Sequence, residues 1–281
     1  MTGLDPLYIE SVVKAALRED VGSGDITTLL TVPENTRATG EVVTKRDGVL
    51  CGQDVAWAVF STLHGGDAYE ICLRDGVRVR PGDVPARVSG DARGILTGER
   101  VALNFLQRMS GIATLTARYV DLVSHTKAKI VDTRKTTPGL RRLEKYAVTV
   151  GGGFNHRFGL SDGILIKDNH IAVAGGVRKA VEAAKARAPH TLKIEVEVVD
   201  LDMLREAIDS GADAVLLDNM PLEMMREAVA ISDDKVLLEA SGGVNESTVA
   251  AIAETGVDLI SVGALTHSAP ALDISLEVRV G

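Results

Sequence analysis

The stretch KIEVEVVDLDMLREAIDSGADAVLLDNMPLEMMREAVA (193–230) holds two apolar, strand-like segments, each followed by a segment with helical periodicity. Outward from it, further segments of the first kind recur at intervals of roughly 20 to 35 residues, with helical patterns between them. The full set is KIVDT (129–133), GILIK (163–167), KIEVEV (193–198), AVLLD (214–218), KVLLEA (235–240) and LISVG (259–263). This alternation predicts a parallel sheet whose strands are buried on both faces.

A polar residue or a glycine stands at or near the carboxyl end of every one of these segments. The set is Asp132, Lys167, Glu197, Asp218, Ser241 and Gly263. Because the carboxyl ends of barrel strands build the active site, this pattern favours a barrel over an open sheet. Six strands do not complete a (β/α)8 barrel, so we expect an incomplete one.

The part of the chain before about residue 93 has a different character. It shows a helical pattern over 8–19 and short strand-like segments bounded by Gly, Asp or Pro. These signals predict a small α+β unit. A long helix should follow, with Thr97 as its N-cap, and should run to about Val123 with or without a break at Gly111.

Composition excludes several classes of function. The 281 residues include 45% hydrophobic and 3% aromatic side chains, with a net charge of −8. An acidic chain with few aromatics is poorly suited to nucleic acid. Cys51 and Cys72 have no metal or redox spacing, and we interpret them as a pair of buried thiols. The sequence has neither a signal-peptide pattern nor an apolar run long enough to cross a membrane, which favours a cytoplasmic protein.

Cations are concentrated between residues 127 and 170 in spite of the overall negative charge. The set is Lys127, Lys129, Arg134, Lys135, Arg141, Arg142, Lys145, Arg157 and Lys167, with His156 beside Arg157. Converging cations indicate a small anion that carries both phosphates and carboxylates.

Two motifs in this segment leave alternatives open. In DTRKTTPG (132–139), Arg134 and Lys135 either bind an anion or belong to an ordinary solvated loop. In RRLEKY (141–146), the three cations either contact the ligand or form the wet face of a helix.

The glycine-rich turn GGGFNHRFGL (151–160) allows close backbone approach to a ligand. His156 in this turn is either a ligand-binding residue or a packed core histidine. Lys167 is either a Schiff-base nucleophile or a permanent ammonium that pairs with anions, and the surrounding arginines favour the ammonium.

Glu197 and Asp218 end successive strands and should lie close together. Two such carboxylates can hold Mg²⁺ through substrate phosphates, accept hydrogen bonds from sugar hydroxyls, or form simple salt bridges. The turns SGGV (241–244) and SVGALTHS (261–268) predict a phosphate cradle made by the last two strands. The sequence has no His pair at zinc-ligand spacing, so we do not expect a catalytic transition metal.

In their order along the chain, these motifs resemble those of the quinolinate phosphoribosyltransferases. The resemblance rests on DTRKTTPG, GGGxNHR, LIKDNH, EVEV, LLDN, EASGG and VGALTHS, and on EDVGSGDITT and TGERVALNFLQRMSGIAT in the first part. It implies a type II phosphoribosyltransferase fold. The N-terminal α/β sandwich would comprise 1–112 and the incomplete six-stranded α/β barrel 113–267, with a tail (268–281) that packs on the first domain.

The resemblance also implies a reaction. Quinolinate and phosphoribosyl pyrophosphate, with Mg²⁺, give nicotinate mononucleotide, pyrophosphate and CO₂ in NAD biosynthesis. The family implies a homodimer, or an oligomer built from dimers, with an active site shared across the interface.

Family motifs assign roles to residues of this chain. The quinolinate-binding set would be Arg134, His156, Arg157 and Lys167, with Arg100 from a second copy, and Thr133 would also bind substrate. Lys135, Glu197 and Asp218 would handle the ribose and the metal pyrophosphate and supply the catalysis. Ser241, Gly242, Gly243 and Gly263 would form the 5′-phosphate cradle.

Three rival functions are weighed against this one. The first is a phosphoribosyltransferase for another base, but Arg100, Arg134 and Arg157 are all present to bind a dicarboxylate. The others are an aldolase that uses Lys167 and a non-catalytic sensor of the sugar pyrophosphate.

Overall fold

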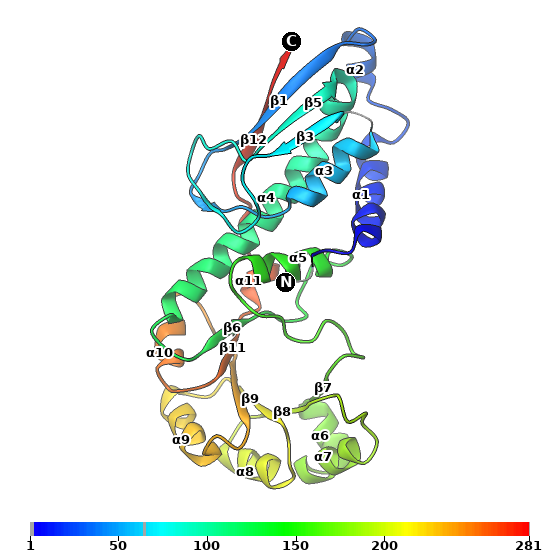
Figure 1. Ribbon diagram of the computed structural model, residues 1–281. Helices are drawn as coiled ribbons and strands as arrows, with labels where there is room; N and C mark the ends of the chain where they lie inside the picture. The colour runs from blue at the N-terminus through cyan, green and yellow to red at the C-terminus, as the bar shows by residue number, and fades with distance from the viewer. Residues whose placement is uncertain (1–2, 64–65, 281) are drawn as a thin grey trace. The chain divides into compact units, whose positions relative to one another are not determined.

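The computed structural model describes residues 3–63 and 66–280 (Figure 1). The chain divides into two compact units. Unit 1 comprises Met1–Ala117, Thr136–Gly152 and Ser268–Gly281, and unit 2 comprises Arg118–Lys135 and Gly153–His267. The boundaries expected for the folding domains, after residues 112 and 267, stay a prediction.

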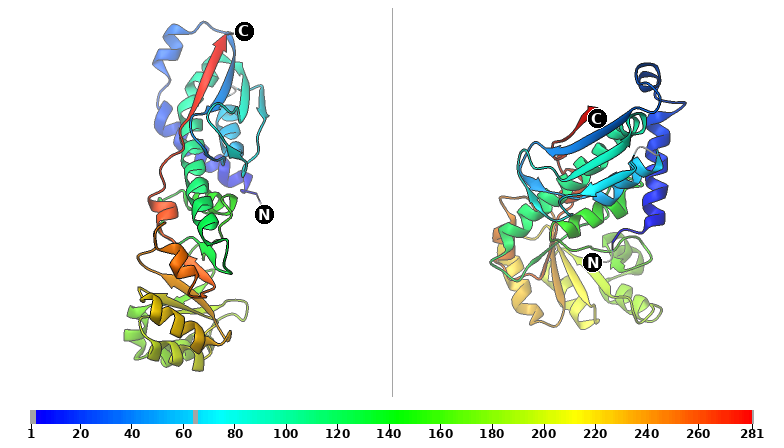
Figure 2. Two further views of the ribbon diagram at one scale, coloured as in Figure 1. Left: turned by 90° about the vertical axis from the view of Figure 1, so that its left-hand side faces the viewer. Right: turned by 45° about the horizontal axis from the view of Figure 1, so that its top comes forward.

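Unit 1 is built on an antiparallel sheet of four strands. Their order is β12 (Ile274–Val280), β1 (Arg37–Thr44), β5 (Ala86–Asp91) and β3 (Ala68–Ile71), and a separate short pair joins β2 (Gly48–Val49) to β4 (Arg78–Val79). The last strand of the chain lies beside β1, as the red and blue arrows in Figure 2 show. Residues more than two hundred positions apart therefore share one ladder, as in the pair Thr44 and Ile274.

Helices account for the rest of unit 1. They are α1 (Pro6–Val21), α2 (Ile26–Thr31), α3 (Gln53–Thr62), α5 (Arg141–Val150) and most of α4 (Ala92–Val123). The carboxylate of Asp5 caps α1 by accepting from the Leu7 N–H at 3.0 Å, and Pro6 sits at the first helical position, where a missing N–H costs nothing. The helix predicted over 8–19 is confirmed.

The long helix α4 begins five residues earlier than predicted. Thr97 is not its N-cap: it lies inside the helix, and its hydroxyl donates to Asp25 at 3.2 Å. The helix is continuous through Gly111. A Cβ at Gly111 would collide with the Pro270 carbonyl oxygen, so this glycine permits close packing inside unit 1 rather than a break.

Unit 2 contains a parallel sheet of six strands, as predicted. Its order is β6 (Lys129–Val131), β11 (Leu259–Ser261), β10 (Leu237–Ser241), β9 (Ala214–Asp218), β8 (Ile194–Val198) and β7 (Ile164–Ile166). The helices are α6 (Asp168–Ala174), α7 (Val177–Lys185), α8 (Leu201–Asp209), α9 (Leu222–Ser232), α10 (Val249–Ala253) and α11 (Ala264–His267). Figure 1 shows α6 to α9 along the outer side of the strands.

The two edges of this sheet, β6 and β7, are consecutive in sequence. Residues 153–163, which follow α5 and lead into β7, begin by extending the β6 edge. The Phe154 N–H donates to the Ile130 carbonyl at 2.9 Å, and its carbonyl accepts from the Asp132 N–H at 3.1 Å. This pairing carries the glycine-rich turn, with its histidine and arginine, to the open edge of the sheet.

Two expectations about burial need correction. Lys145 does not lie on a wet helix face, because its side chain is completely buried on α5 beside the buried Glu144. The interpretation of two buried thiols holds for Cys51 and is wrong for Cys72, which is exposed. Across the described ranges, the structure contains no helix that is long and apolar enough to cross a membrane.

Candidate functional site

Polar residues line the carboxyl ends of the unit 2 strands, as the sequence predicts. Asp132 and Lys167 directly follow β6 and β7, Glu197 is the last residue but one of β8, and Asp218 and Ser241 end β9 and β10. We call this edge of the sheet, together with Gly263 after β11, the rim.

At the rim, Lys167 and Glu197 are joined in an ion pair. The Lys167 Nζ donates to Glu197 Oε2 at 2.8 Å. The lysine side chain is 46% exposed and the glutamate side chain 15% exposed. This environment is that of a cation, whereas a Schiff-base nucleophile requires a neutral amine.

The Ser-Gly-Gly turn after β10 packs tightly against the end of β9. Asn219 adopts the left-handed backbone conformation (φ 52°) and donates from Nδ2 to Asp218 at 3.1 Å. A Cβ at Gly242 would collide with the Asn219 side chain. Gly243 is exposed, and no described atom lies within 4 Å of where its Cβ would be. The turn therefore presents bare backbone to open space.

Lys135 lies beside the turn after β11. Its backbone N–H donates to Thr133 Oγ1 at 3.0 Å, and its carbonyl accepts from Thr266 Oγ1 at 2.7 Å. A Cβ at Gly263 would lie 3.1 Å from the Lys135 side chain and 3.3 Å from that of His267. Glycine at 263 thus allows both side chains to approach the backbone. His267 was not among the site residues predicted from the sequence.

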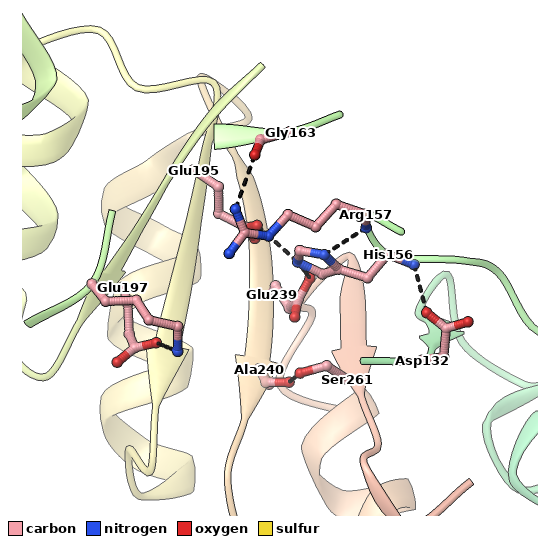
Figure 3. Close-up of polar contacts among 10 residues, drawn as sticks. Asp132, His156, Arg157, Gly163, Glu195, Glu197, Glu239, Ala240 and Ser261 are labelled. Atoms are coloured by element: carbon pink, nitrogen blue, oxygen red, sulfur yellow. Dashed lines mark hydrogen bonds and ion pairs between the residues drawn. The ribbon is translucent and has the colours of Figure 1, made fainter. Parts of the chain in front are cut away.

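Within the strands, away from the rim, His156 contacts two carboxylates that were not predicted as site residues (Figure 3). Its Nε2 is 2.9 Å from Glu195 Oε2 and 3.8 Å from Glu239 Oε2. Both glutamates are buried, and Glu239 is only 1% exposed. The available signal was a charged residue inside a strand of otherwise apolar residues, which is rare without a partner.

The backbone around His156 is anchored by Asp132, which is completely buried. Its Oδ1 accepts from the His156 N–H at 2.9 Å, and its Oδ2 accepts from Asn155 Nδ2 at 2.6 Å. Asp132 therefore anchors the turn that carries His156 and Arg157.

Arg157 has an incompletely used guanidinium. Its Nη1 donates to the Gly163 carbonyl at 2.9 Å, but its buried Nε has no hydrogen-bond partner among the residues that the structure describes. Burial lowers the pKa of Arg157, and the nearby charge of Arg134 lowers it further. Two neighbouring guanidiniums with a spare buried donor are an arrangement that an anion would stabilise.

An open pocket of about 380 Å³ borders these groups. Its wall includes His156, Arg157, Glu195 and Glu239, together with the first residues of several strands, such as Ile164 and Ala214. The pocket thus opens at the amino ends of the strands, while Lys167, Glu197, Asp218 and Ser241 lie at their carboxyl ends.

Burial raises the pKa of the Glu239 carboxyl to about 8, and the charge of Glu195 adds to the effect. The histidine and a hydrogen bond with Ser261 oppose the shift. Glu239 is therefore mostly protonated at neutral pH.

Arg100 belongs to unit 1, whereas the other predicted site residues belong to unit 2. It is exposed on α4 and lines a pocket of about 410 Å³ together with Asp20, Asp25 and Thr97. Within one chain, the structure therefore assigns Arg100 to a different unit from the residues of the rim.

Several relatives of this chain are known. Family models for the C-terminal and N-terminal domains of quinolinate phosphoribosyl transferase match residues 112–277 and 25–110. The nicotinate-nucleotide pyrophosphorylase (carboxylating) of Mycobacterium leprae is 49% identical over 272 residues, which cover 95% of each chain. A probable enzyme of the same description from Bacillus subtilis is 43% identical over 277 residues, covering 99% of this chain and 96% of the relative.

A solved structure agrees with the sequence matches. NadC from Streptococcus pyogenes superposes with a TM-score of 0.96 at 43% identity, and the match covers 100% of both chains. Matches of this extent, in both domains and in the fold, show that the chain belongs to the quinolinate phosphoribosyl transferase family.

Proposed function

We propose that this protein transfers the phosphoribosyl group of phosphoribosyl pyrophosphate to quinolinate, with loss of CO₂, to form nicotinate mononucleotide for NAD biosynthesis. Family membership supports the reaction class. The observation that supports the substrate is the Arg157 guanidinium, which is half-buried beside Arg134 with a spare Nε donor. Quinolinate is a dianion, and paired guanidiniums bind carboxylates with good geometry.

In this proposal, Arg134, Arg157 and Lys167 bind the two carboxylates of quinolinate, and Thr133 supplies a hydroxyl beside them. Arg100 of a second copy would complete the set in a homodimer. His156 was expected to bind quinolinate as well, and that expectation stays a prediction. Its Nε2 contacts Glu195 and its Nδ1 accepts from the Arg157 N–H at 2.7 Å, so both ring nitrogens already have protein partners.

The sugar pyrophosphate would occupy the rim. The open backbone at Gly243 suits the 5′-phosphate, with Ser241, Gly242 and Gly263 beside it, because exposed N–H groups bind phosphate oxygens. Lys135 is exposed beside this turn and would bind the pyrophosphate. Its charge would stabilise the leaving group as the glycosidic bond breaks.

Glu197 and Asp218 fit a magnesium ion only in part. Carboxylate oxygens are the ligands that Mg²⁺ prefers, and substrate phosphates commonly supply the rest. The group of described residues that has metal-ligand spacing does not include these two carboxylates. They would therefore hold the ion together with the phosphates. When bound, Mg²⁺ neutralises charge that develops on the pyrophosphate.

The Lys167–Glu197 ion pair suggests how the two substrates cooperate. A quinolinate carboxylate that takes over the Lys167 ammonium would release the Glu197 carboxylate toward the ribose. Glu197 and Asp218 would then offset the positive charge on the ribosyl centre while the pyridine nitrogen attacks. The quaternary nitrogen formed in this way favours loss of the C2 carboxylate, and orientation supplies much of the rate.

The test is an assay with quinolinate, phosphoribosyl pyrophosphate and Mg²⁺ that measures nicotinate mononucleotide and CO₂. We expect both products in equal amounts and little turnover of nicotinate, which lacks the second carboxylate. Equal use of nicotinate would point to a phosphoribosyltransferase for another base. Binding without release of pyrophosphate would point to a sensor.

Sharing of the active site between copies is tested by complementation. Arg100→Ala and Arg134→Ala should each abolish most of the activity as homodimers. After the two variants are unfolded and refolded together, one site in each mixed dimer has both arginines, so roughly a quarter of the wild-type activity should return. No recovery from mixed dimers would contradict the role of Arg100.

A further inference from the structure

His156 forms a cluster with Glu195 and Glu239, and these two glutamates have no role in the reaction described above. The cluster lies in the interior of unit 2 beside the pocket at the amino ends of the strands, below the rim on the same strands. Figure 3 shows the imidazole between the two carboxylates and the backbone of Arg157. Buried carboxylates are costly and are seldom present without a function.

Hydrogen bonding fixes the tautomer of the imidazole. Nδ1 accepts from the Arg157 N–H at 2.7 Å, so Nδ1 carries no proton. The ring proton must then reside on Nε2, which donates to Glu195 Oε2 at 2.9 Å. The ring thereby bridges the Glu195 carboxylate and the backbone of Arg157.

Glu239 also lies close to the imidazole. Its Oε2 is 3.8 Å from His156 Nε2, and its buried Oε1 has no partner within the described parts of the chain. The raised pKa of Glu239 keeps its carboxyl protonated at neutral pH, which spares the site a second negative charge.

The same three side chains have the spacing of a metal site. Metal binding through Nε2 would require removal of the proton that the Nδ1 bond places there. The observed hydrogen bonds therefore disfavour a metal ion and favour a rigid support.

We propose that Glu195 and Glu239 are positioning residues that hold the His156 ring and, through the Arg157 N–H, fix the Arg157 guanidinium where it binds quinolinate. This inference rests on the proposed function, which it deepens. Asp132 fixes the same turn from the opposite side through the His156 N–H. Arg157 is thereby held by its backbone, and its Nε remains available for the ligand.

The first test breaks the bridge at Glu195. Glu195→Ala should raise the KM for quinolinate roughly ten- to a hundredfold, because small displacements of a binding group have effects of this size. The KM for phosphoribosyl pyrophosphate should change little. Glu195→Gln retains a carbonyl that accepts from Nε2, and should recover much of the loss. Equal changes in both KM values, or no rescue by Gln, would overturn the proposal.

A matched control exists on the surface of unit 2. His125 Nε2 lies 3.2 Å from Glu254 Oε1, and both side chains are more than half exposed, at 52% and 58%. Glu254→Gln should leave both KM values unchanged. A change equal to that of the Glu195 variant would mean that the effect comes from general charge.

The second test does not depend on the reaction. Nitrogen-15 spectra of the imidazoles should show His156 as the Nε2–H tautomer in the wild-type protein and as a mixture in Glu195→Ala. A mixture in the wild type would refute the bridge even if the enzyme is active. The expected tautomer in a protein that does not use quinolinate would refute the proposed function alone.

A third test uses pH. The charged groups that act on Glu239 are Glu195 from β8 and His156 from the turn, and the wall of the same pocket also carries Arg157, Lys193 and Asp162. Above about pH 8, ionisation of Glu239 would add a negative charge near a dianionic ligand. The KM for quinolinate should therefore rise in the wild type and stay flatter in Glu239→Gln. Identical pH profiles would contradict the role of Glu239.

Discussion

Each unit of the molecule contains a buried charged cluster, and the two clusters are built differently. In unit 1, Glu144 is 1% exposed, and both of its oxygens have partners. Oε1 accepts from Arg108 Nη2 at 2.8 Å and from Arg108 Nε at 3.2 Å, and Oε2 accepts from the Thr137 N–H at 3.0 Å. Every polar atom of this carboxylate is satisfied by the protein itself.

In unit 2, the cluster of His156, Glu195 and Glu239, with the adjacent Arg157, is incomplete when its hydrogen bonds are compared in the same way. Glu239 Oε1 and Arg157 Nε are buried polar atoms without a hydrogen-bond partner in the part of the chain that the structure describes. Unsatisfied buried groups cost stability, and native proteins keep few of them. We infer from the difference that the satisfied cluster serves the fold, while the incomplete one leaves buried polar atoms for a ligand.

The largest effect is expected from breaking the satisfied cluster. Glu144→Ala leaves the Arg108 charge without its buried partner, so the free energy of unfolding should fall by about 3–5 kcal/mol. Urea unfolding measures this change. Glu10→Ala, which removes an exposed ion pair with Lys14, is the control and should have no measurable effect. A small loss in Glu144→Ala would mean that satisfaction of buried polar atoms does not distinguish the clusters.

An intermediate effect, on binding instead of stability, is expected at Arg157. Arg157→Ala removes charge-assisted hydrogen bonds to the ligand worth about 1.5–3 kcal/mol, which corresponds to a roughly ten- to a hundredfold weaker Kd for quinolinate. Calorimetric titration measures it. The free energy of unfolding should stay within about 1 kcal/mol, because the lost bond to Gly163 is offset by relief of the unpaired Nε. Large destabilisation with unchanged affinity would reverse the comparison.

A third effect is the pH dependence of stability at Glu239. The pKa of this carboxyl rises from 4.5 to about 8 on folding, so between these values the folded chain keeps a proton that the unfolded chain releases. Its contribution to stability therefore falls as the pH rises from about 4.5 to about 8 and is constant above. The Glu239→Gln variant has no titrating carboxyl at this position, so its stability should not fall in this way.

The free energy of unfolding should be measured at pH 5, 6.5 and 8 for the wild type and for Glu239→Gln. As the pH rises, the variant should become more stable relative to the wild type. Glu254→Gln serves again as the control, since its carboxylate is exposed. If the free energies of unfolding of wild type and variant changed in parallel with pH, Glu239 would be ionised in the folded protein over this pH range.

Much of the fold of unit 2 was predictable from the sequence, because its six strands are short apolar runs with clear helical patterns between them. The residues at the strand ends were predictable for the same reason, since Asp218 and Ser241 directly end such runs. The start of α4 was not predictable, because Ala92, Arg93 and Gly94 continue the pattern of short strand-like segments before them, yet they form the first turn of the helix.

The incomplete cluster was missed for a physical reason. Strand periodicity places Glu195 and Glu197 on the same face of β8, but only the fold decides which of them lies deep and which reaches the rim. The partner of Glu195 comes from a turn 39 residues away in sequence. The burial of Lys145 was missed likewise, since helical periodicity does not tell which face of a helix packs when both carry charges.

The pairing of β12 with β1 bears on how the chain is made. A ribosome delivers β1 early, and β12 comes after every other described element. Until then one edge of β1 lacks its ladder partner, and an unpaired edge is a template for wrong pairing. Unit 2, which closes at His267, can form before the sheet of unit 1 is complete. The strands of unit 2 can therefore pair with one another while β1 still lacks its partner β12.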